Sequence, residues 1–223
     1  MAPHDPSSAR RAGVLVWGVV TYAVHWAATL AFIAFLGNIA PITGIDADAS
    51  GAWQARSIAI DLTLLAGFVI THWVMARDWW KQWWVRFVPV PVERATYVLI
   101  ASLLVLALVR YWQRLPGVIW DVRDSPAGTA VYALYLGGWL LAIAATFPIN
   151  HWDLFGIRQV WLYFRGIPYT PPVATPSVLY RLPHPIFVGY VIAVWSAPRM
   201  SAGHLLLTAL LTTFVFVSVR LAR

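Results

Sequence analysis

The stretch that decides the fold lies in the last third of the chain. It reads NHWDLFGIRQVW at residues 150–161, continues through a proline-rich connection, and reads YRLPHPIFVG at residues 180–189. Histidine, aspartate and arginine side chains stand here between two strongly apolar stretches. We therefore expect the chemistry of this protein to lie beside a membrane.

The composition predicts an integral membrane protein. Of the 223 residues, 60% are hydrophobic and only 11% are charged, whereas soluble domains carry about a quarter charged residues. The 14 Trp and 9 Tyr fit the aromatic belts at the headgroup level. The absence of Cys excludes disulfides and thiolate metal sites. No nucleic-acid signature accompanies the net charge of +7.

Hydropathy predicts an all-α, polytopic bundle of five to six membrane helices. A membrane span needs roughly 20 apolar residues, and four stretches qualify: Gly13 to Leu36, Arg56 to Met75, Ala95 to Tyr111 and Thr129 to Phe147. The segment Ile186 to Ala197 is short and ends before Pro198, while Ser201 to Leu221 is long enough to cross. The last two helices are expected to form a hairpin whose first arm does not fully span.

The distribution of basic residues predicts that both termini are cytoplasmic. With residues 1–12 as a short cytoplasmic tail, eleven of the 16 Lys and Arg lie on the inner side. These eleven are Arg10, Arg11, Arg77, Lys81, Arg86, Arg94, Arg158, Arg165, Arg181, Arg220 and Arg223. The loop at residues 37–54 carries only acidic charge.

Two segments on the inner side have the pattern of interfacial helices. The tryptophans of residues 77–84 recur at i, i+1, i+4 and i+5, which predicts an anchoring helix in the membrane interface. Residues 154–165 alternate as an amphipathic helix on the membrane surface, with Trp161 on its apolar side. Prolines then exclude continuous helix until the final hairpin. Residues 150–183 thus form a cytoplasmic amphipathic helix and linker within a single domain, 1–223.

Polar residues inside the spans need partners or functions. His25 and Asp61 lie at similar depth, so they could pair structurally or carry a proton or metal role. His72 lies close in depth to His151, Asp153 and His184, which suggests a polar pocket at the inner leaflet. No HExxH or CxxC spacing supports zinc or haem, so we expect no metal site.

The turn at His184-Pro185 has a specific physical meaning. Proline favours the first turn of a helix, so the helix from Ile186 would present free N–H groups and its positive dipole end to an anion such as a carboxylate. Gly189 follows one turn later and lacks a Cβ, which would leave room for a ligand. A helix start followed by a packing glycine is the competing interpretation.

At these residues the sequence resembles the membrane methyltransferase family that includes isoprenylcysteine carboxyl methyltransferase, and most closely the bacterial methanethiol S-methyltransferases. The resemblance runs over nearly the whole chain. It includes Gly37-Asn38, Asp61, residues 72–77, 86–89, 93–94, 118–121, 150–163, 168–171 and 203–206. It implies a multi-pass protein of the bacterial inner membrane that binds S-adenosylmethionine at the cytoplasmic face, with the lipid bilayer and a small thiol as partners. The methyl group would pass to methanethiol and give dimethyl sulfide.

The family's cofactor motif, Arg-His-Pro-x-Tyr-x-Gly, maps onto residues 183–189. Histidine, proline and glycine are kept as His184, Pro185 and Gly189, while Pro183 and Phe187 depart from the pattern. The family's glutamate pair after an Arg-Leu step is replaced by Ala222-Arg223. The resemblance implies cofactor binding by His184, Pro185 and Gly189, and Tyr180 and Arg181 are the neighbouring groups that could compensate for the departures.

Three histidines are candidates for the catalytic base or for a group that polarises the thiol. His72, His151 and His184 qualify because histidine titrates near neutral pH and the thiolate is the nucleophile. Two alternatives stay open for the whole protein. The acceptor could be a prenylcysteine carboxylate or another lipid-borne group, or the chain could be a diverged membrane subunit without catalysis.

Overall fold

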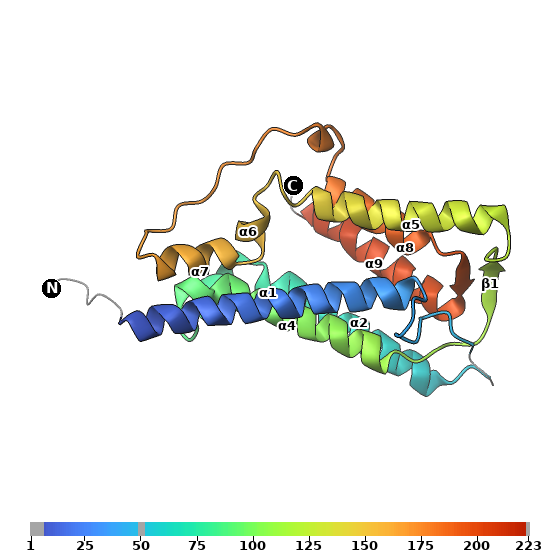
Figure 1. Ribbon diagram of the computed structural model, residues 1–223. Coiled ribbons are helices and arrows are strands. Elements are labelled where there is room, and N and C mark those ends of the chain that lie inside the picture. The colour runs from blue at the N-terminus through green and yellow to red at the C-terminus, as the bar shows by residue number, and fades with distance from the viewer. Residues whose placement is uncertain (1–6, 49–51, 222–223) are drawn as a thin grey trace.

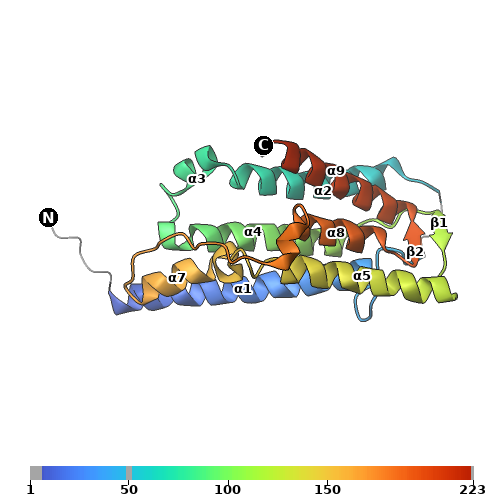
Figure 2. The same ribbon diagram turned by 90° about the horizontal axis from the view of Figure 1, so that it is seen from above.

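The protein is a multi-pass membrane protein whose structure, a computed structural model, is mostly helical and describes residues 7–48 and 52–221. Five helices in these ranges are long and apolar enough to cross a membrane. They are α1 (Ser8–Leu36), α2 (Ala55–Met75), α4 (Val90–Tyr111), α5 (Pro126–Ala144) and α9 (Ala202–Leu221). Figures 1 and 2 show them running side by side along one common direction.

The final hairpin has the predicted asymmetry. Its first helix, α8 (Pro185–Trp195), has only 11 residues, while α9 has 20. Pro198 follows α8 closely, and the chain continues in extended form before α9 begins. Figure 1 shows this extended segment lying across the end of the bundle, where it leads to the start of α9.

The expectation of an all-α fold is corrected by two short strands. β1 (Val118–Asp121) and β2 (Arg199–Ser201) pair antiparallel at one end of the bundle. The indole N–H of Trp120 donates to the Ala197 carbonyl over 2.8 Å, and the Val122 N–H donates to the Pro198 carbonyl over 2.8 Å. These bonds satisfy backbone groups that the proline-interrupted segment cannot bond within a helix. We name this the strand end of the bundle.

The opposite end, which we name the linker end, carries the short helices α3 (Asp78–Trp84), α6 (His151–Leu154) and α7 (Ile157–Phe164). It also carries the linker, residues 165–184, with the 3-10 turn η1 (Val178–Arg181). In α3, Trp79 and Trp83 are exposed, and Trp80 and Trp84 pack against a cluster of Met75, Tyr97 and Val98.

Part of the segment predicted to be a cytoplasmic tail is helical. Residues 1–6 of the predicted tail lie outside the described residues, but Ser8 to Ala12 already form the first turns of α1, after Ser7 accepts a hydrogen bond from the Arg10 N–H. With 29 residues, α1 is about 43 Å long, which exceeds the roughly 30 Å hydrocarbon core of a bilayer.

The helix α7 packs against the bundle. It runs along α1 (Figures 1 and 2), where Gly18 leaves space for the buried Val160. Trp161, predicted on the apolar side, is exposed. The helix is broken before α7, where Gly156 adopts a φ of 84° and packs on the backbone of Ala95. Arg94 donates to the Leu154 carbonyl over 2.8 Å and holds this break in place.

The helices α5 and α8 approach each other closely at a pair of glycines. A Cβ on Gly138 would lie 2.6 Å from the Ala193 nitrogen, and one on Gly189 would lie 2.5 Å from the Ala142 nitrogen. Two facing glycines therefore let the two backbones touch, as small residues do in many membrane helix pairs. This contact fixes the level at which α8 begins.

A buried polar cluster joins the loop after α1 to the start of α9 at the strand end. Asp46 accepts hydrogen bonds from the Asn38 amide (2.8 Å), the Ser201 N–H (2.7 Å) and His204 Nδ1 (2.8 Å). Burial by itself would raise the pKa of Asp46, but the bonds and charge of its partners outweigh burial and hold that pKa below the ordinary value of 3.8. We name these four residues the Asp46 cluster.

Replacing Gly138 should test the contact between α5 and α8. Gly138→Ala adds a methyl group where the α8 backbone already lies, so we expect a loss of about 1–3 kcal/mol in stability. The neighbouring Gly137 has no heavy atom within 4 Å of an added Cβ, so Gly137→Ala is the matched control and should be neutral. Thermal unfolding in detergent measures both. Equal melting temperatures for the two variants would contradict the packing.

The Asp46 cluster should give the protein a specific pH dependence. Because the folded pKa of Asp46 is lowered, its stabilising contribution is complete above the ordinary pKa of an aspartate and is lost as the pH falls through the folded value. Asp46→Asn should therefore cost about 1.5–3 kcal/mol at pH 7, with a smaller difference from the unmodified protein at pH 3. Asp48→Asn, at a side chain that is 85% exposed, is the control. A difference independent of pH would refute this assignment.

Candidate functional site

The three histidines predicted to be catalytic lie on separate elements toward the linker end. His72 belongs to α2, His151 is the first residue of α6, and His184 directly precedes α8. Within the described ranges, no hydrogen bond or ring contact joins any two of the three. The structure thus provides three distinct environments instead of one histidine cluster.

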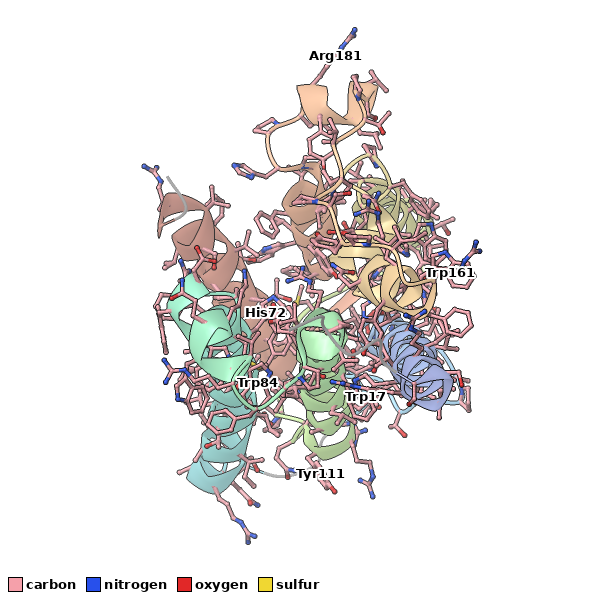
Figure 3. The ribbon with its side chains drawn as sticks, turned by 90° about the vertical axis from the view of Figure 1, so that its left-hand side faces the viewer. Trp17, His72, Trp84, Tyr111, Trp161 and Arg181 are labelled. Carbon is pink, nitrogen blue, oxygen red and sulfur yellow. The ribbon has the colours of Figure 1, made fainter. Side chains whose placement is uncertain are left out.

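His72 lies inside the bundle, between α2 and α4 (Figure 3). The Tyr97 hydroxyl is 3.0 Å from Nδ1 and 3.1 Å from Nε2 of the imidazole. Phe68 stacks on the ring at 5.4 Å between centroids, and Phe214 of α9 meets it edge-on at 6.3 Å. His72 therefore has one hydroxyl partner in an otherwise aromatic environment.

His151 is buried, with 3% of its surface exposed, and both of its ring nitrogens are bonded. The Tyr22 hydroxyl lies 2.7 Å from Nε2, and the Thr146 hydroxyl lies 2.6 Å from Nδ1. Thr146 also donates to the Ile143 carbonyl over 2.6 Å. All hydrogen-bonding groups are satisfied when the proton of the neutral ring is on Nδ1. The Nδ1–H then donates to the Thr146 hydroxyl oxygen, and the Tyr22 hydroxyl donates to Nε2. Burial also lowers the pKa of His151, which favours this neutral ring.

His184 is exposed and starts α8 from a left-handed backbone conformation with φ of 51°. Its side chain does not cap the helix, and the buried Pro185 occupies the first helical position. The first turn of α8 therefore presents N–H groups without a side-chain partner from His184. The Phe187 ring stacks near the imidazole at 6.0 Å between centroids.

The linker residues Tyr180 and Arg181 lie close to this helix start in the chain. The Tyr180 hydroxyl donates to the Ala145 carbonyl over 3.0 Å, which ties η1 to the end of α5. Burial raises the pKa of Tyr180. Arg181 is exposed and extends away from the body of the protein (Figure 3). Both residues thus precede α8 in the chain, with the Tyr180 hydroxyl bonded to the end of α5 and the Arg181 guanidinium pointing outward.

Two expectations from the sequence are corrected. The space beside Gly189 is filled by the backbone of α5 and is not open to a ligand, because Gly138 and Ala142 occupy it. His25 does not pair with Asp61: the His25 ring packs on Phe155 at 4.2 Å, whereas Asp61 accepts from the Gln113 N–H over 2.8 Å. His25 therefore lies beside the residue that follows α6, and Asp61 lies beside the residues that follow α4.

Sequence reasoning missed the hydroxyl partners of the histidines. Tyr22, Tyr97 and Thr146 each lie on or beside an apolar helix, where a hydroxyl is unremarkable by itself. Tyr22 could have been noticed because it lies three residues before His25, on one face of α1 with Trp26. Tyr97 lies three residues after Arg94, whose guanidinium is 5.0 Å from the Tyr97 ring centre.

Two shallow concavities of about 520 and 300 Å³ run along the outer face of α2. The larger is lined by α2 residues such as Leu62, Thr63, Gly67 and Ile70. Neither is lined by a residue predicted to bind the cofactor or to act in catalysis. They follow from small side chains on one helix face and do not form a nucleoside site.

Comparisons with known proteins place this architecture in a family. No protein-family model matches the chain, and no solved structure matches it. Curated relatives do match over most of its length. A methanethiol S-methyltransferase of Mycobacterium tuberculosis is 41% identical over 92% of this chain and 84% of its own length. Methanethiol S-methyltransferase 1 of Bradyrhizobium diazoefficiens is 41% identical over 92% of this chain and 72% of its own length.

More distant relatives extend the comparison beyond bacteria. Nurim of Rattus norvegicus is 31% identical over 81% of this chain and 74% of its own length. The extent and number of the bacterial matches lead to one conclusion: the chain belongs to the methanethiol S-methyltransferase family.

Proposed function

We propose that this protein transfers a methyl group from S-adenosylmethionine to a small thiol, converting methanethiol to dimethyl sulfide. The observation that carries the proposal is the 41% identity to methanethiol S-methyltransferases over 92% of the chain. The exposed turn at the start of α8 supports it, since the uncapped helix end suits an anion and the His184 imidazole lies exposed beside it.

The residues at this turn fit the charged parts of S-adenosylmethionine. The free N–H groups of the first turn of α8 suit a carboxylate, and Arg181 adds a positive charge from η1. When bound, S-adenosylmethionine supplies an electrophilic methyl group on a sulfonium. Tyr180, Arg181, His184 and Pro185 would hold it, while Gly189 acts indirectly by letting α8 pack on α5. The departures at Pro183 and Phe187 leave this set intact, since Phe187 retains an aromatic ring beside His184.

The acceptor thiol must lose its proton, because the thiolate is the nucleophile. His72, His151 and His184 are the proposed groups for this task, and their surroundings separate them. Both ring nitrogens of His151 are hydrogen-bonded, which suits a structural role in holding α6 against α1. His72 has a hydroxyl partner and faces apolar rings, and His184 is exposed at the linker. His72 and His184 can therefore exchange a proton without breaking two buried hydrogen bonds, as His151 would have to.

We also propose that the linker end faces the cytoplasm and that both termini lie there. The alternation of the helices from α1 to α9 supports this orientation, as does the concentration of basic residues at the linker end. The donor would then arrive from the cytoplasm, and a small volatile thiol could enter from the bilayer. An apolar surrounding strengthens the attraction between thiolate and sulfonium.

Activity tests the proposal directly. Membranes that contain the protein should release labelled dimethyl sulfide when given methanethiol and S-adenosylmethionine labelled in the methyl group. The purified protein should also bind S-adenosylmethionine, which a non-catalytic scaffold would not. Membranes from cells with an empty vector are the control. Binding without label in dimethyl sulfide, but with label in an added prenylcysteine, would instead identify a lipid-borne acceptor.

His184 should be required for efficient turnover. Replacing it by Ala is expected to lower kcat/KM by roughly tenfold to a thousandfold, the range for a positioned polar group at a reacting centre. Because His184 has a positive φ, His184→Asn is the matched variant: Asn tolerates this backbone conformation and removes only the imidazole. Steady-state kinetics measures both. Unchanged turnover in His184→Asn would remove the ring from the site and leave His72→Ala and His151→Ala as the next variants to compare.

A further inference from the structure

Asp153 is a second polar centre at the linker end, and the chemistry proposed above does not use it. It lies in α6, two residues after His151, and its side chain is 18% exposed. One carboxylate oxygen, Oδ1, lies 3.3 Å from Arg158 Nη1, and the other, Oδ2, accepts from the Tyr169 hydroxyl over 3.2 Å. Asp153 thus contacts both α7 and the linker.

Arg158 reinforces the same connection. Its Nη1 donates to the Thr170 carbonyl over 2.5 Å, and its guanidinium lies 5.5 Å from the centre of the Tyr169 ring. Burial and the adjacent Asp153 raise the pKa of Tyr169, so the phenol remains a donor. Asp153, Arg158 and Tyr169 form what we name the Asp153 cluster. It fastens residues 169 and 170 of the linker to α6 and α7.

The cluster is attached to the rigid part of the protein on its other side. Asp153 shares α6 with His151, whose bonds to Tyr22 and Thr146 fix α6 to α1 and α5. Beyond the cluster, the linker touches the body through the Thr175 N–H, which donates to the Pro148 carbonyl over 2.7 Å, and through Tyr180. Between these points the linker is largely exposed, with Val173 at 91%.

We propose that Asp153 is a positioning residue for the S-adenosylmethionine site, because it holds the first part of the linker against α6 and α7. This inference rests on the proposed function. The five prolines of the linker limit its backbone freedom, so a fixed position at residues 169 and 170 restricts where Tyr180, Arg181 and His184 can lie. Asp153 itself does not touch the reacting atoms.

A positioning role has a kinetic consequence that a role in the chemical step lacks. A linker that is already ordered loses less conformational entropy when the donor binds. Without the Asp153 cluster, the donor must order the linker during binding, while the bound complex has the same geometry. The apparent affinity for S-adenosylmethionine should therefore fall, and turnover at saturating donor should change little.

Asp153→Asn tests this in the full-length protein in detergent. It keeps the size of the side chain and the Asn150 cap on the backbone N–H of residue 153, but removes the charge. We expect the KM for S-adenosylmethionine to rise about tenfold, as for loss of a charge-assisted hydrogen bond, with kcat within about twofold. Hydrogen exchange at residues 166–175 should become faster. Tyr169→Phe, which removes one bond only, should shift both quantities in the same direction and by less.

Asp124→Asn is the matched control, because Asp124 is exposed at the strand end and the substitution makes the same chemical change. The double variant Asp153→Asn with Tyr169→Phe should raise KM by less than the product of the single effects, since both act through one contact. The proposal would be overturned if both single variants kept the KM and the hydrogen-exchange rates of the unmodified protein. It would also be overturned if the substitutions lowered kcat and left KM unchanged. If the protein turned over no S-adenosylmethionine at all, the proposed function would fail, whereas the exchange comparison would still decide whether Asp153 fastens the linker.

Discussion

The close approach of α5 and α8 is the constraint on which the linker end depends. Gly138 and Gly189 face each other so that the two helix backbones touch, and no side chain could be added between them without moving one helix. This contact sets the position of Pro185 and His184 relative to the end of α5. The linker must then cover the distance from α7 to that fixed point, and its bonds to Ala145, Pro148 and Asp153 lie along the way.

The two ends of the bundle are built on different principles. At the strand end, Asp46 lies in a closed set of hydrogen bonds, and the pairing of β1 with β2 satisfies the extended backbone. At the linker end, exposed residues are held at a few separated points. Local stability follows the density of buried contacts, so the strand end and the packed helices α6 and α7 supply rigidity, while the exposed linker supplies adaptable surface for a ligand.

Much of the helical framework could be predicted from the sequence, because a span of about 20 apolar residues has few alternatives in a bilayer. The short α8 was also predictable, since Pro185 and Pro198 bound it. The two strands could not be predicted, because residues 118–121 and 199–201 have no sequence pattern that indicates pairing between segments so far apart in the chain. The role of Gly189 was ambiguous for a similar reason: a glycine permits close approach, but only the fold reveals that the neighbour is α5.

The candidate site was predictable in its residue types and not in its arrangement. His72, His151 and His184 could be singled out because ionisable groups are rare in apolar segments. Their hydroxyl partners were not evident, since Tyr22 and Tyr97 are ordinary residues in a membrane helix. The packing of the His25 ring on Phe155 was not evident either, nor was the left-handed turn at Gly156 that precedes α7.

The length of α1 links the site to the thickness of the lipid around it. At about 43 Å by rise per residue, α1 extends beyond the hydrocarbon layer, and α7 lies along this extension where Val160 meets Gly18. Bilayers differ by several ångströms between membranes, and helices respond to such mismatch by tilting. A tilt of α1 would carry α7 with it and would act on α6, which His151 bonds to both α1 and the end of α5, so the acyl-chain length of the host lipids becomes a physical variable that acts on the linker end.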